Sequence, residues 1–374
     1  MTTNVKDRLY LQVIINGQTL PDTQILIDYI HIAESCRQYL PVLTMSIQDS
    51  IKFLTSKSLL EDGALIQVII GVANKKLDYT FRQFSVKENQ NAGSMEYKIT
   101  AYLNVPKYWS SSATESKRGS VSSVLQDISK DTDLSYEGVT TSENQLWPPH
   151  NKKYCEYARS ISERGYLDES SCLQQVVTLD KKLRYLNVTD QFSKADAENF
   201  SNRPADSSTK VITDYRVKNS SGFFNAISGY KDKKIIQSLL AEDLVLDKTS
   251  VAKHSKHVSI SSEVREGTDQ GSISFSPIEI GNSSENYEQS LYQNRRLSNL
   301  YVEGIEFMTP RPIDSSVLDI VSLELSKPGA ESVAEISGKY IVVSKVIYVK
   351  ELNFYTKLEV FRHGSNKIVK SDLE

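Results

Sequence analysis

Met95-Glu-Tyr-Lys-Ile-Thr-Ala-Tyr-Leu103 decides the fold, because its apolar and polar residues alternate as they do in a half-buried β-strand. Phe81-Arg-Gln-Phe-Ser-Val86 precedes it with a similar strand character, and the two stretches together predict a long β-hairpin. The pattern returns near the other end of the chain, where Tyr340-Ile-Val-Val-Ser-Lys-Val346 precedes Phe354-Tyr-Thr-Lys-Leu-Glu-Val-Phe361. The sequence therefore predicts a strand-rich protein with two hairpins of nearly equal length.

The segment before each hairpin extends this comparison. One strand begins after Asp62 and the other after Asp314, so an acid-led strand, a loop and a hairpin occur twice in the same order. Because any two β-hairpins alternate, chance competes with duplication as the explanation. If the β domain is duplicated, a closed cyclic oligomer contains twice as many similar units as chains, and a trimer has quasi-sixfold symmetry.

The first hundred residues contain further runs of alternating residues, bounded by Gly, Pro, Asn and Asp. One or two helical turns are expected within 50–60. Six strands joined by short turns indicate either a sandwich or a small barrel. The predicted strands are 9–15, 25–32, 42–47, 65–70, 79–86 and 97–103.

The middle of the chain changes character after the serine-rich stretch 110–123, which predicts a domain boundary. Apolar residues have helical spacing over 121–128, and Ser120 is placed to cap that helix. A second amphipathic helix is predicted over 154–161, with Gly165 in the left-handed position that often ends a helix. Two strands, 173–179 and 183–188, follow with a turn between them.

Strand patterns dominate the last part of the chain as well. The stretch 248–271 is polar and has one short strand pattern, and 285–296 has helical spacing with a thin apolar face. The remaining predicted strands are 211–217, 258–261, 300–307, 318–325, 340–349 and 353–361.

Composition restricts the function. The 374 residues are 39% hydrophobic and 24% charged, which is typical of globular domains, and the net charge is only −3. The basic runs Lys152-Lys153 and 231–234 are interpreted as solvated loop charge, so tight binding of nucleic acid is not expected. Neither a signal peptide nor an apolar run of membrane-spanning length is present, which predicts a soluble chain made in a cytoplasm.

Candidate chemistry is sparse. The three cysteines, Cys36, Cys155 and Cys172, lack CxxC spacing and are expected to be reduced structural residues. His254 and His257 have the spacing of a helical metal pair but lie in a polar context without a nearby acid, so no metal site is expected. The common motifs of hydrolases, nucleotide-binding proteins and zinc proteases do not occur. The acids Asp168, Glu169 and Asp180 are expected in turns or beside helices rather than as a glycosidase pair.

Aromatic residues are the better candidates for a functional surface. Tyr and Trp are enriched at protein interfaces because they bury a large area and keep a polar tip. Tyr102, Trp109 and Trp147 are therefore the candidate oligomer-interface residues. For Trp147, in the loop Trp147-Pro-Pro-His150, the alternative is a local core position.

The order of these features resembles the trimeric baseplate or tail hub proteins of tailed bacteriophages, which are related to the N-terminal hub part of VgrG-type spikes. The resemblance covers essentially the whole chain and lies in the order of its motifs and in the total length. It rests on Val13-Ile-Ile-Asn-Gly17, Pro41-Val-Leu-Thr-Met-Ser-Ile-Gln-Asp49, the Asp62-Gly63 strand start, Tyr97-Lys-Ile-Thr-Ala-Tyr-Leu-Asn-Val-Pro106, Gln145-Leu-Trp147, the helix 154–165, Asp168-Glu-Ser-Ser171, Leu183-Arg-Tyr-Leu186, Gly338-Lys-Tyr-Ile-Val-Val-Ser-Lys-Val346 and Thr356-Lys-Leu-Glu-Val-Phe-Arg-His-Gly364.

The resemblance implies an α+β, mainly β fold with two tail-tube-like β-barrel domains, a small α+β domain and an insertion. The expected domains are a first barrel at 1–106, an α+β domain at 107–200, a second barrel at 201–234 and 299–364, an insertion in it at 235–298, and a C-terminal tail at 365–374 that is either a strap to a partner or disordered.

The resemblance also implies a non-enzymatic function without a cofactor. Three chains would form a pseudo-sixfold ring that joins the tail tube to a separate spike, contacts other baseplate proteins and passes DNA through a neutral or acidic lumen. Such a protein is assembled in the host cytoplasm and resides in the virion, without membrane insertion. The alternatives are the hub of a bacterial contractile injection system of the type VI kind and, from another class, a tail-associated wall-degrading enzyme or sugar-binding protein.

Overall fold

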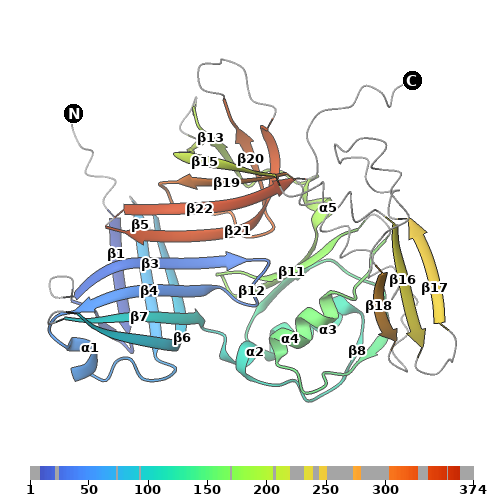
Figure 1. Cartoon of the computed structure of the whole chain (residues 1–374), viewed down its shortest axis with the longest axis horizontal. Coiled ribbons are helices and arrows are strands. Elements are labelled where there is room, and N and C mark those ends of the chain that lie inside the picture. Colours follow the sequence, from blue (N-terminus) through green and yellow to red (C-terminus); the bar gives the residue numbers. More distant parts are fainter. Residues whose placement is uncertain are drawn as a thin grey trace.

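The structure, a computed structural model, describes residues 9–21, 25–72, 75–91, 94–168, 171–204, 208–219, 231–238, 244–250, 273–278, 303–326, 336–351 and 353–362. Strands predominate and the helices are short, which confirms the mainly β, α+β prediction (Figure 1). The predictions for 258–261, 285–296, the histidine pair at 254 and 257, and the tail at 365–374 lie outside these residues.

The six strands predicted in the first hundred residues are all present and form the first β unit. Apolar residues of each strand point to one core, and the polar residues between them point away. A four-residue helix, α1 (Phe53–Ser56), lies within the segment predicted to be helical. The strands are β1 (Leu9–Ile15), β2 (Gln18–Thr19), β3 (Ile25–Ser35), β4 (Val42–Asp49), β5 (Leu65–Val72), β6 (Lys75–Asn91) and β7 (Ser94–Leu103).

The middle domain contains both predicted helices. The Ser120 side chain accepts a hydrogen bond from Ser123 N, which confirms the predicted N-cap. Three strands form its small sheet, in which β12 pairs with β11 on one side and with β9 on the other. The elements are α2 (Pro106–Ser110), β8 (Lys117–Gly119), α3 (Val121–Asp131), β9 (Ser135–Gly138), β10 (Gln145–Trp147), α4 (Tyr154–Ser162), β11 (Leu173–Val177), β12 (Lys182–Asn187) and α5 (Val188–Gln191).

The prediction for Gly165 is wrong. The cap of α4 is Glu163, and Gly165 does not have the positive φ of a left-handed terminating residue. A Cβ at this position would run into the hydroxyl of Tyr185 and approach Val121 Cγ1 to 3.2 Å. Gly165 is therefore required by close packing against β12 and α3, and not by backbone conformation.

The last part of the chain forms a second β unit and a separate small sheet. Strand β13 lies within the predicted middle domain but pairs with β20, so it joins the second unit. Residues 231–234, interpreted from the sequence as loop charge, begin strand β16 instead. The strands of the second unit are β13 (Glu198–Ser201), β14 (Lys210–Val211), β15 (Asp214–Asn219), β19 (Glu303–Thr309), β20 (Ile320–Glu324), β21 (Gly338–Lys350) and β22 (Asn353–Arg362), and those of the small sheet are β16 (Lys231–Ser238), β17 (Leu244–Ser250) and β18 (Ile273–Ile278).

The two long hairpins have the same register throughout. In β6–β7 the pairing skips Phe84 as a β-bulge and continues to the pair Asn91↔Ser94. In β21–β22 it skips Val343 and continues to the pair Lys350↔Asn353. Adding 259 to each number of the first hairpin gives its counterpart in the second, since 84 becomes 343, 91 becomes 350 and 94 becomes 353. A shared bulge is far more specific than shared alternation, so the two hairpins are structural repeats.

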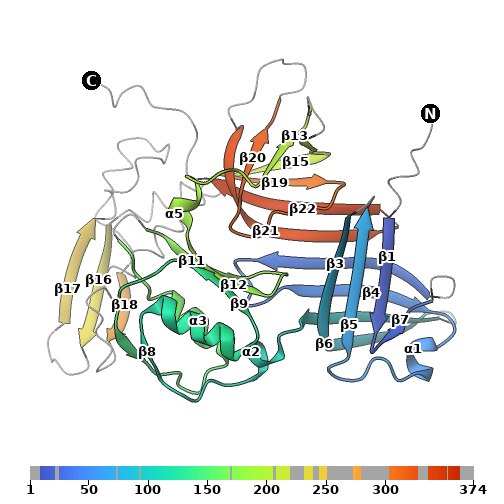
Figure 2. The same cartoon turned by 180° about the vertical axis from the view of Figure 1, so that it is seen from behind.

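The neighbouring strands repeat as well. The order β5-β6-β7-β4-β3 in the first unit matches β20-β21-β22-β19-β15 in the second, and all of these pairs are antiparallel. Strand β21 also pairs with β3 and so joins the two units into one sheet. We call the resulting series β15-β19-β22-β21-β3-β4-β7-β6 the ladder; it descends in this order in Figure 1, while β1 and β5 stand across it in Figure 2.

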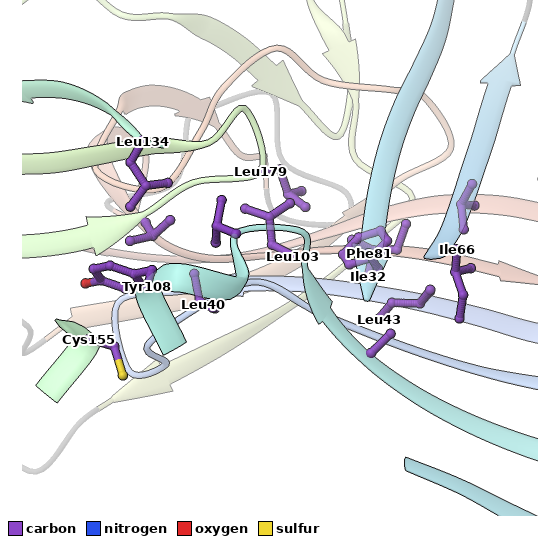
Figure 3. Close-up of a cluster of buried hydrophobic side chains, with 14 of the residues drawn as sticks. Ile32, Leu40, Leu43, Ile66, Phe81, Leu103, Tyr108, Leu134, Cys155 and Leu179 are labelled. Carbon is purple, nitrogen blue, oxygen red and sulfur yellow. The ribbon is translucent and has the colours of Figure 1, made fainter. Parts of the chain in front are cut away.

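The core continues from the first β unit into the middle domain. Ile32, Leu43 and Phe81 of the first unit belong to the same buried cluster as Tyr108 and Leu179 of the middle domain (Figure 3). A second cluster fills the second β unit and includes Val343. Burial of apolar surface, worth roughly 25 cal/mol per Å², stabilises these contacts between the parts of the chain.

A buried carboxylate ties the three parts together. Glu34 of β3 is fully buried, and its two oxygens accept hydrogen bonds from Leu179 N of the middle domain (2.7 Å) and from Val317 N of the second unit (2.9 Å). Burial raises the pKa of Glu34, although the nearby charge of Lys345 and the two amide donors partly oppose this. Arg184 of the middle domain also donates to Val317 O, at 2.6 Å.

Candidate assembly interface

An aromatic cluster lies on β6, β7 and α2. The rings of Tyr102 and Trp109 have centroids 5.7 Å apart, and Phe84 lies 5.0 Å from Tyr102 and 6.2 Å from Trp109. Phe84 is 55% exposed, while the other two side chains are partly buried. The structure thus brings together two of the three predicted interface residues and adds Phe84, which the sequence interpretation missed.

A signal for Phe84 was present in the sequence. In Phe81-Arg-Gln-Phe-Ser-Val86 the inward positions are Phe81 and Gln83, so strict alternation would turn Phe84 to the other face and Ser85 inward. Val86 breaks that alternation, because it is apolar where a polar residue is expected. Such a break is typical of a β-bulge, which re-aims the side chain at the extra residue.

Trp147 has a different role. It is 2% exposed, and its indole Nε1 donates to Gly119 O at 2.9 Å. Its carbonyl accepts a hydrogen bond of 2.6 Å from the Tyr157 hydroxyl. Trp147 therefore belongs to the local core of the middle domain, and the interface prediction for this residue is corrected.

The ladder has an unpaired strand edge at each of its two ends, among the described residues. Strand β5 pairs with β6 only along 75–82, which leaves the outer edge of β6 beyond the bulge without a partner strand. At the other end of the ladder, β15 pairs with β19 alone. Side chains on both edges are exposed, among them Lys87, Glu88, Arg216 and Val217. Charged residues on an edge discourage indiscriminate pairing with other chains.

The face of the ladder opposite its core, here called the polar face, carries paired charges of both signs. Lys218 lies 2.7 Å from Glu306 and 3.2 Å from Glu359, and Lys357 lies 2.7 Å from Glu306. On β7, Lys98 contacts Glu96 at 3.1 Å. Each acid in these pairs has a basic partner, so neither sign dominates among them.

These pairs alter the ionisation of the groups involved. Burial opposes ionisation of Glu306, but its hydrogen bonds with Lys218 and Lys357 outweigh this and lower its pKa. Burial likewise opposes charge on Lys218, and its two glutamate partners outweigh it and raise the pKa of Lys218. Both signs of charge thus persist on the polar face at neutral pH.

The acids and cysteines considered as candidate catalytic residues make local hydrogen bonds or are buried. The backbone N–H of Asp168 donates to the Ser171 hydroxyl, which in turn donates to the Asp168 carbonyl. The Asp180 carboxylate accepts a hydrogen bond from Thr178 in the β11–β12 turn. Cys36, Cys155 and Cys172 are buried and form no disulfide. Within the described ranges no cluster of His, Cys, Asp and Glu is placed to hold a metal, and none of the helices there is long and apolar enough to cross a membrane.

Solved structures share this fold over nearly the whole chain. The 43 kDa tail protein of prophage MuSo2 from Shewanella oneidensis has a TM-score of 0.60 at 9% identity, covering 95% of this chain and 98% of that chain. The tail protein from Neisseria meningitidis MC58 has a TM-score of 0.59 at 10% identity, covering 95% and 97%. A chain of the half-lidded Francisella PdpA-VgrG complex has a TM-score of 0.50 at 11% identity, covering 96% of this chain and 59% of that chain.

No protein-family model matches the chain, and no curated protein matches its sequence. The similarity is therefore one of fold, at identities too low to carry function by themselves. The chain has the fold of phage tail proteins, as the resemblance in its sequence predicted.

Proposed function

We propose that the chain is a structural hub of a phage tail baseplate, and that three copies form a ring containing six similar β units. The observation that carries this proposal is the repeat, in which two hairpins share register and bulge and two units share their strand order. Three copies of a chain with two similar units form a ring of six similar units. Such a ring has threefold symmetry by chain and quasi-sixfold symmetry by unit, so it can join a sixfold partner to a threefold one. The shared fold with phage tail proteins supports the setting.

The ring joins the tail tube on one side to a separate central spike on the other and contacts other baseplate proteins. It is assembled in the host cytoplasm and becomes part of the virion. Its lumen is lined by the polar face and lets DNA pass without specific binding. The ion-paired charges of that face and the net charge of −3 support this, because a tight DNA site needs concentrated unpaired basic charge.

Imaging of the purified chain by negative-stain electron microscopy tests the ring. Particles with threefold symmetry and a central hole are expected. Isolated particles without a hole, at a concentration where the chain is fully folded, would contradict the proposal.

The proposed role is structural and not enzymatic. The surroundings of Asp180 support this, because its carboxylate accepts a hydrogen bond from Thr178 and pairs with Lys182 at the β11–β12 connection. A peptidoglycan-release assay with the purified protein distinguishes the two classes. No release is expected, and clear turnover would favour the wall-degrading alternative.

A second candidate is the hub of a bacterial contractile injection system. The similarity to a chain of the Francisella PdpA-VgrG complex favours it, since the described fold is shared with that chain too. The surrounding genes separate the candidates: capsid and DNA-packaging genes are expected beside a phage hub, and secretion genes without capsid genes beside the other.

A further inference from the structure

The two β units of the chain are joined by a pair of strands, which we call the internal joint. Strand β21 of the second unit pairs with β3 of the first, in antiparallel register from Ser344↔Ser35 to Lys350↔Tyr29. The bulge residue just before this stretch, Val343, accepts a hydrogen bond from Cys36 N at 3.1 Å. Its side chain is 2% exposed and packs in the same cluster as Cys36.

Each strand of this joint has a counterpart in the repeat. Strand β21 corresponds to β6 through the shift of 259 residues. The same shift makes Tyr102 equivalent to Phe361, so their partners on the next strands, Val42 of β4 and Gly304 of β19, are also equivalent. Val42 pairs in turn with Ala33 of β3, and Gly304 pairs with Lys218 of β15. Strand β3 therefore corresponds to β15 with a shift of 185 residues, since 33 becomes 218.

The counterparts are the two unpaired edges. The segment of β6 equivalent to 344–350 is 85–91, which lies beyond its pairing with β5. The equivalent of β3 is β15, whose outer edge has no partner strand among the described residues. These two edges lie at opposite ends of the ladder, so they do not meet within one chain (Figure 1).

The exposure of the bulge residues points to a missing neighbour. Val343 and Phe84 occupy the same position in the repeat, yet Val343 is 2% exposed and Phe84 is 55% exposed. Val343 is covered because β3 lies beside it. No such strand lies beside Phe84 in the part of the chain that the structure describes. An exposed phenylalanine next to an unpaired edge is typical of an interaction site.

We propose that the edge of β6 at 85–91 pairs in antiparallel register with β15 of a second copy of this chain, and that Phe84 is buried in this contact. The proposal rests on the proposed function and specifies the contact that closes the ring. The proposed contact between two chains has the same geometry as the pairing of β21 with β3 within one chain. The ladder therefore continues from one copy to the next. Subtracting 259 from the β21 numbers and adding 185 to the β3 numbers gives the expected intermolecular register. The internal pairs Ile347↔Ile32 and Tyr348↔His31 then correspond to Glu88↔Val217 and Asn89↔Arg216 between chains.

The contact is of the head-to-tail kind, because two different edges meet. A head-to-tail contact produces a closed ring when its rotation closes and a filament when it does not. The register brings Lys87 opposite Lys218, which would be repulsive for two free lysines. Lys218 already lies between Glu306 and Glu359, which compensate its charge.

Paired cysteines test this contact. Residues directly opposite in an antiparallel pair have Cβ atoms about 4.5–5.5 Å apart, close enough for a disulfide after a small adjustment. The chain carrying Glu88→Cys and Val217→Cys is therefore expected to form covalent trimers under mild oxidation, seen on a non-reducing gel. The three native thiols are buried and give little background.

A matched control shifts the register. Lys87→Cys with Asp214→Cys places the thiols four residues out of register, roughly 13 Å apart along a strand, so no cross-linked trimer is expected. Either single variant, Glu88→Cys or Val217→Cys, can give at most a dimer. Trimers from the shifted pair, or none from the matched pair, would overturn the proposed register.

Native mass spectrometry of the same variants under reducing conditions separates the two proposals. Trimers without cross-linking of the matched pair would overturn this contact and leave the proposed function standing. Monomers under all conditions, with unchanged circular dichroism, would overturn both. Trimers that cross-link only through the matched pair support both.

Discussion

The carboxylate of Glu34 accepts hydrogen bonds from Leu179 N and Val317 N, amides that belong to two other parts of the chain. In Glu34→Gln one acceptor oxygen remains, while the side-chain amide turns an N–H toward the second donor. We expect the free energy of unfolding to fall by about 1–3 kcal/mol, because one buried amide loses its partner. Urea denaturation at fixed pH measures the change, and equal midpoints for the two proteins would contradict this role.

The same residue predicts a pH dependence. Burial raises the pKa of Glu34 above its ordinary value of 4.5. Between that value and the higher pKa of the folded state, the folded chain holds more protons than the unfolded chain. Stability contributed by Glu34 therefore falls as pH rises through this window. The difference in unfolding free energy between wild type and Glu34→Gln should shrink with rising pH, and a difference that grows would contradict the direction of the shift.

Val343 and Phe84 form a matched pair for mutation, because they hold the same place in the two hairpins. Val343→Asp puts a carboxylate at a 2% exposed position and should lower the free energy of unfolding by roughly 3 kcal/mol or more. Phe84→Asp changes a 55% exposed side chain, so the folded chain should persist while trimers are lost.

Thermal melts and native mass spectrometry read out the two effects separately. An unaffected melting temperature for Val343→Asp would show that the inward face of β21 is assigned wrongly. Trimers that persist in Phe84→Asp would show that Phe84 does not lie at the interface.

At the scale of elements, Gly165 sets the approach of the α4 end to β12. Its position leaves room for Tyr185, whose hydroxyl donates to Ser162 O at 3.0 Å. We expect Gly165→Ala to lower the free energy of unfolding by about 1–3 kcal/mol, because the added methyl overpacks this contact. The penalty should be smaller in a Tyr185→Phe background, where the hydroxyl is absent. A double-mutant cycle by urea unfolding measures this coupling, and equal penalties in both backgrounds would contradict the packing explanation.

The longer elements were predictable from sequence because a period of two or 3.6 is visible over enough residues. Six of the seven strands of the first unit and helices α3 and α4 were found in this way, including the Ser120 cap, while the two-residue strand β2 was not. Short strands such as β13 were not predictable, since four residues show no clear period and their pairing is decided by distant strands. Strand β16 was missed because its lysines suggested a loop.

At the scale of the whole molecule, the sequence indicated the repeat but not how its copies join. The β21–β3 pairing links residues more than 300 positions apart, and no local pattern encodes it. For the candidate interface, Tyr102 and Trp109 were expected from residue type alone. Phe84 depended on recognising a bulge, and the burial of Trp147 depended on packing that residue type does not reveal.

The central proposal is that three chains imitate six units in one ring. Native mass spectrometry of the full chain across a concentration series tests it most directly. The predicted result is a dominant species of three times the 42.1 kDa chain mass, with no dimer and no open series of larger oligomers. A dimer, or a monomer that persists at the highest concentration at which the chain remains folded, would contradict it.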